Sequence, residues 1–212
     1  MANHCLFESD IKTFINEKLE IIRDTLSTGY HGTELTTTKE AWSAEIEILQ
    51  NILSPWANTQ EHIIFEYDIP RLGKRIDVVL LLKGIIFCLE FKVGQSSILE
   101  IDIDQVLDYA LDLRNFHKLS QDKIIVPILI ATNTNKYSTD IKYSIYDNKV
   151  LNPLVTGTNN LARLLNSVIS KFPNEKPLNN KEWIKSPYTP TPTIIEAART
   201  LYENHNVEDI TR

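Results

Sequence analysis

Two acidic residues and a lysine interrupt apolar segments near the middle of the chain. Asp77 lies in the apolar run 75–82, and Glu90 and Lys92 lie in the run 85–93. Carboxylate oxygens are the ligands that hard divalent cations such as Mg²⁺ and Mn²⁺ prefer. A cation held there could lower the pKa of a bound water and stabilise charge on a phosphate. A lysine beside it could orient the attacking water or stabilise the developing negative charge.

The two apolar runs predict a β-hairpin that brings these charges together. Only Lys83 and Gly84 separate the runs, and a two-residue connection with glycine favours a tight turn. Counting back from this turn places Asp77 directly opposite Glu90, where like charges destabilise a strand pair. A bound divalent cation is one explanation for this pair, and the apolar surroundings favour it. The alternative is a solvated strand face on which Lys92 forms an ion pair with one carboxylate.

A third carboxylate, Glu45, lies in a helix expected over about residues 38–53. At 100° per residue, Glu45 falls within the apolar stripe that contains Trp42 and Leu49. A carboxylate that faces the core is costly unless it is paired or binds a metal. Glu45 therefore either reaches the sheet and completes the shell of the cation, or escapes to solvent at the edge of the stripe.

The order of the expected elements indicates an α/β protein with a mixed sheet flanked by helices. An apolar periodicity near 3.6 residues predicts helices, and short apolar runs predict strands. Pro127 lies inside the last strand, which suggests an edge position or a bulge for that strand. The helices are expected over about 9–26 (with Ser9 or Asp10 as N-cap), 38–53, 102–118 and 159–171, and the strands over about 61–69, 75–82, 85–93 and 123–131.

These charged residues resemble a known signature. Asp77 followed by Glu90-Phe-Lys92 resembles the D-x(n)-E-x-K signature of the PD-(D/E)xK nuclease superfamily. The segment from Gln105 to Tyr109 is similar to the Gln-x-x-x-Tyr helix of the RecB-like branch of that superfamily. The order of the expected elements also matches its restriction-endonuclease-like α-β-β-β-α-β core.

The resemblance implies a nuclease that hydrolyses phosphodiester bonds in DNA or RNA with Mg²⁺ or Mn²⁺. The implied metal ligands are Asp77, Glu90 and Glu45, and the implied catalytic residues are Asp77, Glu90 and Lys92. The residues implied to support the site or to contact nucleic acid are Gln105, Tyr109 and Arg75.

Composition divides the chain into a main domain and a tail. The main domain is expected over 1–172, with its core over about 38–172. Residues 173–192 hold five of the nine prolines and are expected to form a linker. A short helix is expected over 193–204, so 193–212 would begin a following region.

A broader resemblance covers nearly the whole chain. The chain is similar to the N-terminal domain of Schlafen-related superfamily-1 helicases of bacteria, in the segments 38–42, 67–71, 74–77, 89–92 and 188–199. It implies a C-terminal helicase or ATPase region as partner. The sequence shows no G-x-x-x-x-G-K-[S/T] phosphate loop, so the chain is not expected to hydrolyse ATP by itself.

The bulk composition limits the class of protein. The formal net charge is −6, which lacks the basic signature of a dedicated nucleic-acid binder. The chain shows neither a signal peptide nor a membrane-spanning apolar run, and two cysteines do not make a disulfide framework, so a cytoplasmic location is expected. Two alternatives to a nuclease stay open: a catalytically silent nucleic-acid-binding or regulatory module of the same fold, and a protein-interaction domain in which the charges form a salt-bridge network.

Overall fold

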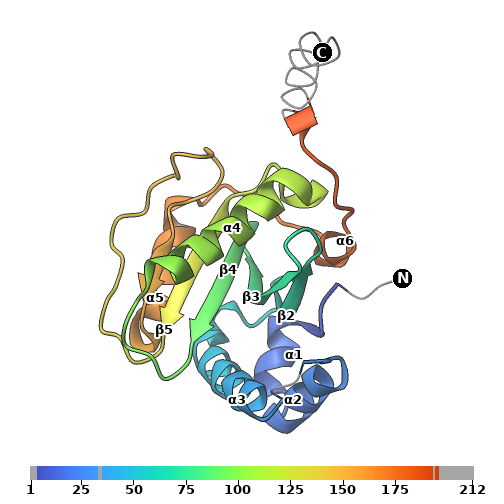
Figure 1. The fold of residues 1–212 in the computed structure, drawn as a ribbon, viewed down its shortest axis with the longest axis vertical. Coiled ribbons are helices and arrows are strands. Elements are labelled where there is room, and N and C mark those ends of the chain that lie inside the picture. Colours follow the sequence, from blue (N-terminus) through green and yellow to red (C-terminus); the bar gives the residue numbers. More distant parts are fainter. Residues whose placement is uncertain (1–3, 33–34, 193, 196–212) are drawn as a thin grey trace, which may run out of the picture.

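The computed structural model describes residues 4–32, 35–192 and 194–195, and it is an α/β protein with a six-stranded mixed sheet (Figure 1). The strands lie in sequence order from β1 to β6; the pairs from β1 to β4 are antiparallel, and β4, β5 and β6 are parallel. The strands are β1 (Phe7–Asp10), β2 (His62–Ile69), β3 (Lys74–Leu82), β4 (Ile85–Lys92), β5 (Ile125–Ala131) and β6 (Leu154–Thr156). The helices are α1 (Ile11–Asn16), α2 (Leu19–Thr28), α3 (Leu35–Ile52), α4 (Glu100–Phe116), α5 (Thr158–Lys171) and α6 (Asn180–Ile184).

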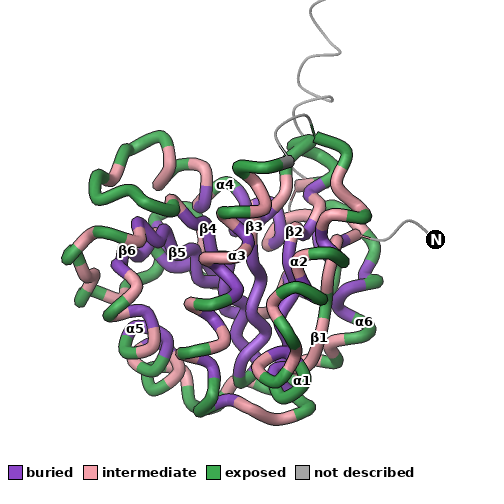
Figure 2. The backbone as a smooth tube through the Cα atoms, turned by 90° about the horizontal axis from the view of Figure 1, so that it is seen from below, coloured by how far each residue is buried: buried purple, intermediate pink, exposed green. Residues whose placement is uncertain are grey.

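Apolar side chains cover both faces of the sheet. The central strands are accordingly buried along most of their length (Figure 2). On one face α1, α2, α3 and α5 pack against residues such as Leu80 and Phe87. On the other face α4 and α6 pack against residues such as Leu81 and Cys88. The expected mixed sheet flanked by helices is therefore confirmed, and so is the order helix–strand–strand–strand–helix–strand from α3 to β5.

The hairpin between β3 and β4 has the predicted tight turn. Lys83 and Gly84 both adopt positive φ angles, 52° and 79°, as the two central residues of a type I′ turn require. The strands pair from Leu82–Ile85 to Val78–Leu89, so the predicted register is confirmed over this stretch. Asp77 and Glu90 lie one residue beyond the last of these pairs.

The helix expected over 9–26 is two helices. Asp10 is the N-cap of α1, because its carboxylate accepts hydrogen bonds from the backbone N–H and the hydroxyl of Thr13. The chain then turns to extended backbone at Glu17 before α2 begins. The Gln50 side chain of α3 donates to the carbonyls of Phe14 and Glu17, so α3 satisfies carbonyls at the end of α1.

Pro127 does not place β5 at the edge of the sheet, so of the two expected alternatives the edge position is wrong. The other, a bulge, agrees with the one-residue shift in pairing between Ile125–Val150 and Ile128–Leu154. The short strand β6, which the sequence reading missed, lies outside β5 and pairs with residues 128–130. Ile125 donates its backbone N–H to Lys149 on that side, and the nitrogen of Pro127 faces the same way because orientation alternates along a strand. Pro127 therefore lies just before the pairing with β6 begins, so its missing N–H removes no hydrogen bond between β5 and β6.

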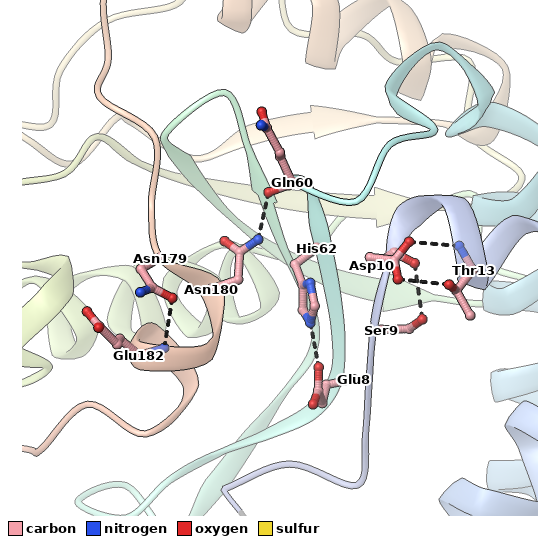
Figure 3. A network of polar contacts seen from close by, with 9 residues as sticks. All are labelled: Glu8, Ser9, Asp10, Thr13, Gln60, His62, Asn179, Asn180 and Glu182. Carbon is pink, nitrogen blue, oxygen red and sulfur yellow. Dashed lines mark hydrogen bonds and ion pairs between the residues drawn. The ribbon is translucent and has the colours of Figure 1, made fainter.

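The segment 173–192, expected to be a linker, packs on the domain. It contains α6, whose Trp183 is fully buried, and Asn180 donates a hydrogen bond of 2.6 Å to the carbonyl of Gln60 (Figure 3). In the same region His62 of β2 contacts Glu8 of β1. The helix expected over 193–204 lies outside the described residues apart from 194–195, and among the described helices we find none with the length and apolar character to cross a membrane.

Candidate active site

The structure brings four carboxylates together where α3 meets β2, β3 and β4. Glu45 comes from α3, Glu66 from β2, Asp77 from β3 and Glu90 from β4. The charges of Asp77, Glu66 and Glu90 all raise the pKa of Glu45, so the four groups lie within electrostatic reach of one another. We call these four residues the carboxylate cluster.

Glu45 faces the core and does not escape to solvent at the edge of the apolar stripe. It is only 4% exposed and lies on the same stripe of α3 as the buried Trp42 and Leu49. Its Oε2 atom is buried and has no hydrogen-bond partner among the described residues. The Glu45 carboxylate is therefore buried because its face of α3 packs on the sheet, and it still lacks a full set of hydrogen-bond partners.

Asp77 lies where β2 and β3 depart from the regular alternation of side chains between the two faces of the sheet. Ile64 and Tyr67 of β2 face the same layer although they are three residues apart, and Ile76 and Val79 of β3 do the same. The Oδ2 atom of Asp77 accepts a hydrogen bond of 2.8 Å from the backbone N–H of Phe91 in β4. This bond fixes Asp77 against β4 beside Glu90.

Glu90 is the centre of the polar contacts. Its Oε1 atom accepts hydrogen bonds from Lys92 (3.0 Å) and from the side-chain amide of Gln105 in α4 (2.9 Å). The same amide donates to the hydroxyl of Tyr109 at 2.6 Å, so Gln105 and Tyr109 act on the same flank of the site. The Oε2 atom of Glu90 is buried and, within the described part of the chain, has no partner.

Burial and mutual repulsion shift the ionisation of the cluster. Burial raises the pKa of Asp77 well above its usual value, and the Glu90 charge adds to the effect. Burial likewise raises the pKa of Glu45, and the charges of Asp77, Glu66 and Glu90 add to it. The pKa of Glu90 is also raised by burial, although Lys92 opposes that shift. The folded protein therefore favours the uncharged, protonated form of these three carboxyl groups.

Lys92 is the one ammonium that contacts the cluster in the described residues. Its Nζ atom lies 3.0 Å from Glu90 and 3.2 Å from Asp102 at the start of α4. Burial acts to lower its pKa, but these two carboxylates more than offset that effect and raise the pKa. Lys92 is thus held charged beside Glu90.

The sequence reading missed two residues of this site. Asp102, in the first turn of α4, forms an ion pair with Lys92. Glu66 had been read only as part of a strand, but it accepts a hydrogen bond from Trp42 and lies 3.8 Å from Arg75. Arg75 thus reaches the cluster through Glu66. No pattern in the sequence marks Glu66, because its position depends on a local change of backbone conformation.

The oxygen donors of the cluster are of the type that hard divalent cations prefer. Within 4–32, 35–192 and 194–195, we find no group of three or more Asp, Glu, His or Cys side chains arranged to hold a metal ion. The cluster nevertheless offers carboxylate oxygens alone, and the unpartnered Oε2 atoms of Glu45 and Glu90 are buried. Buried charges are normally paired or bound to metal, and oxygen ligands suit Mg²⁺ or Mn²⁺. Asp77, Glu90 and Glu45 are the residues that could hold such an ion.

Comparisons with known proteins do not place the chain in a family. No protein-family model matches it, and neither the search of curated proteins nor the search of solved structures found a similar protein.

Proposed function

We propose that this chain is a divalent-metal-dependent nuclease domain with a restriction-endonuclease-like core, which hydrolyses phosphodiester bonds in DNA or RNA. The observation that carries the proposal is the buried carboxylate cluster with two unpartnered oxygens beside a charged lysine. The likeness of Asp77, Glu90 and Lys92 to the PD-(D/E)xK signature supports the same reaction.

Each residue then has a defined task. Asp77, Glu90 and Glu45 would hold Mg²⁺ or Mn²⁺, which when bound supplies a water of lowered pKa and charge stabilisation at the phosphate. Lys92, held by Glu90 and Asp102, would orient the attacking water or stabilise negative charge as it develops on the phosphate. Gln105 would keep the Glu90 carboxylate in place from α4.

The direct test is cleavage of labelled DNA and RNA oligonucleotides with Mg²⁺ or Mn²⁺. We expect Lys92→Ala to lower the rate about 100-fold or more, as for loss of a group that stabilises transition-state charge. Asp77→Ala should cost at least as much, because it removes a cation ligand. Asp104→Asn is a matched control, since Asp104 is an exposed carboxylate of α4. Cleavage that survives both active-site substitutions would contradict the proposal.

A second candidate is a catalytically silent nucleic-acid-binding or regulatory module. The double ion pair of Lys92 favours it, because a lysine neutralised by Glu90 and Asp102 has less charge to offer a phosphate. Binding of an oligonucleotide without cleavage under either metal, unaffected by Asp77→Ala, would identify this module. A protein-interaction domain with a salt-bridge network predicts that calorimetry detects no Mn²⁺ binding dependent on Asp77 and Glu90.

The larger assembly is also a proposal. The resemblance to the N-terminal domain of Schlafen-related helicases supports a C-terminal helicase region as the partner of this domain. Faster cleavage by the longer protein in the presence of ATP would be the expected outcome, and equal rates with and without ATP would contradict it.

A further inference from the structure

Glu66 has a backbone conformation that is uncommon for its residue type. Its φ angle is 53°, within the left-handed region that disfavours side chains with a Cβ atom, although it lies inside β2. Such residues are strained and persist only where the surroundings fix them. At this residue β2 changes which side chains face which layer, because Phe65 faces α3 and Tyr67 faces α4.

The conformation directs the Glu66 carboxylate toward α3. Its Oε1 atom accepts a hydrogen bond of 2.9 Å from the indole N–H of Trp42, and its Oε2 atom lies 3.8 Å from the guanidinium of Arg75. Trp42 is 1% exposed, and its ring packs edge-on against Tyr30. The bond therefore joins a fixed point of the sheet to a fixed point of α3.

Trp42 and Glu45 are one helical turn apart on α3, so they lie on the same face of that helix. A hydrogen bond at Trp42 consequently sets the rotation and height of α3 at Glu45. The two carboxylates differ in their remaining capacity: both oxygens of Glu66 have partners, whereas Oε2 of Glu45 is buried and unpartnered. Glu45 is available to a ligand, and Glu66 is engaged.

We propose that Glu66 is a positioning residue that fixes α3 through the Trp42 indole and so directs the Glu45 carboxylate into the cation site. The inference rests on the proposed function, because the role given to the Trp42–Glu66 hydrogen bond requires that a cation binds at Glu45. Glu66 itself does not bind the cation. The bond needs an acceptor oxygen at position 66, and it does not need a charge there.

The test is the affinity for Mn²⁺, measured by calorimetry without substrate. Glu66→Ala and Trp42→Phe should each weaken Mn²⁺ binding about tenfold, as removal of a group that orients a ligand does. The double variant should be no worse than either single one. Glu66→Gln keeps an acceptor oxygen for the indole, so its affinity should stay within about threefold of wild type. Glu47→Gln, an exposed glutamate on the same helix, is the control.

Two outcomes would overturn the inference. If Glu66→Gln is as harmful as Glu66→Ala while Trp42→Phe binds normally, Glu66 is a ligand and not a positioning residue. If all variants bind as wild type does, the bond has no part in the site.

Failure of the proposed function gives a different result, because the wild-type protein would then bind no Mn²⁺ at all. The Trp42–Glu66 bond is still tested in that case by thermal unfolding in a chelator. The losses in Tm of the two single variants should add to more than the loss of the double variant. Fully additive losses would show that the bond does not fix α3.

Discussion

Two buried polar clusters in the described part of the chain differ in how completely their hydrogen bonds are satisfied. In the histidine cluster, the polar side-chain atoms of His117, Ser120 and Trp183 all have partners. The Ser120 hydroxyl lies 2.6 Å from Nδ1 of the His117 imidazole and accepts a hydrogen bond from the Trp183 indole. The Nε2 atom of His117 lies 3.0 Å from the backbone carbonyl of Trp183. Because a carbonyl only accepts, Nε2 carries the proton and Nδ1 accepts from Ser120.

The carboxylate cluster is the opposite case. It leaves buried oxygens of Glu45 and Glu90 without partners and places like charges together. A satisfied network joins α6 to the end of α4 and needs nothing further, whereas an unsatisfied one costs stability unless something else binds. The difference assigns a structural role to the first cluster and supports a ligand-binding role for the second.

The largest effect on stability should come from His117. Burial lowers its pKa from 6.5 to about 4, so the folded protein excludes a proton that the unfolded chain binds. The free energy of unfolding should therefore be highest above pH 6.5. It should fall by about 3 kcal/mol as the pH drops to about 4, because the unfolded chain takes up the proton and the folded protein does not. His117→Ala should lose about 2–4 kcal/mol at pH 7, because it leaves buried partners unpaired, and its stability should depend less on pH in this window.

Urea unfolding of both proteins between pH 4 and 7 measures this effect. His31→Ala, at an exposed histidine, is the control and should follow the wild-type curve. An unchanged pH dependence after loss of His117 would show that the histidine cluster is not the acid-sensitive element.

The carboxylate cluster should show the opposite sign. Burial and Glu90 raise the pKa of Asp77, so the folded state favours its protonated form, and ionisation above the usual value of 3.8 costs stability as pH rises. Asp77→Asn should therefore stabilise the metal-free protein at pH 7 by at least about 1 kcal/mol, and this gain should shrink toward pH 4.

Thermal unfolding in a chelator tests this prediction, with Asp104→Asn as the exposed control. Addition of Mn²⁺ should reverse the order, because a ligand that binds only the folded state stabilises the wild type and not the variant. A less stable Asp77→Asn protein in the absence of metal would indicate that the cluster is satisfied like the histidine cluster.

The smallest effect should come from Asp102, which contacts the cluster only through Lys92. Asp102→Asn removes one of the two carboxylates that contact the Lys92 ammonium. The Lys92–Asp102 ion pair is partly exposed, and we expect it to contribute about 1 kcal/mol. We expect cleavage to fall about threefold to tenfold, without a change in Mn²⁺ affinity. Asp108→Asn, exposed on the same helix, should cleave at the wild-type rate, and a loss in Mn²⁺ affinity in Asp102→Asn would instead make Asp102 part of the cation site.

Local patterns in the sequence predicted the elements and much of their pairing. The spacing of apolar residues located α3, α4 and α5, and the Lys83-Gly84 turn fixed the register of β3 and β4. These features depend on neighbours in the chain, so they can be read without the fold. The break after α1, the strand β6 and the packing of α6 were missed, because each depends on a distant partner such as Gln50 for α1.

The same distinction applies to the site. The sequence by itself determined that Asp77, Glu90 and Lys92 would share a hairpin, because a two-residue turn sets which residues face each other. Only the tertiary structure decided that Glu45 turns inward, that Asp102 holds Lys92, and that Glu66 bonds to Trp42. Those contacts depend on how a helix is docked on a sheet and on one left-handed residue in β2, and neither leaves a periodic mark in the sequence.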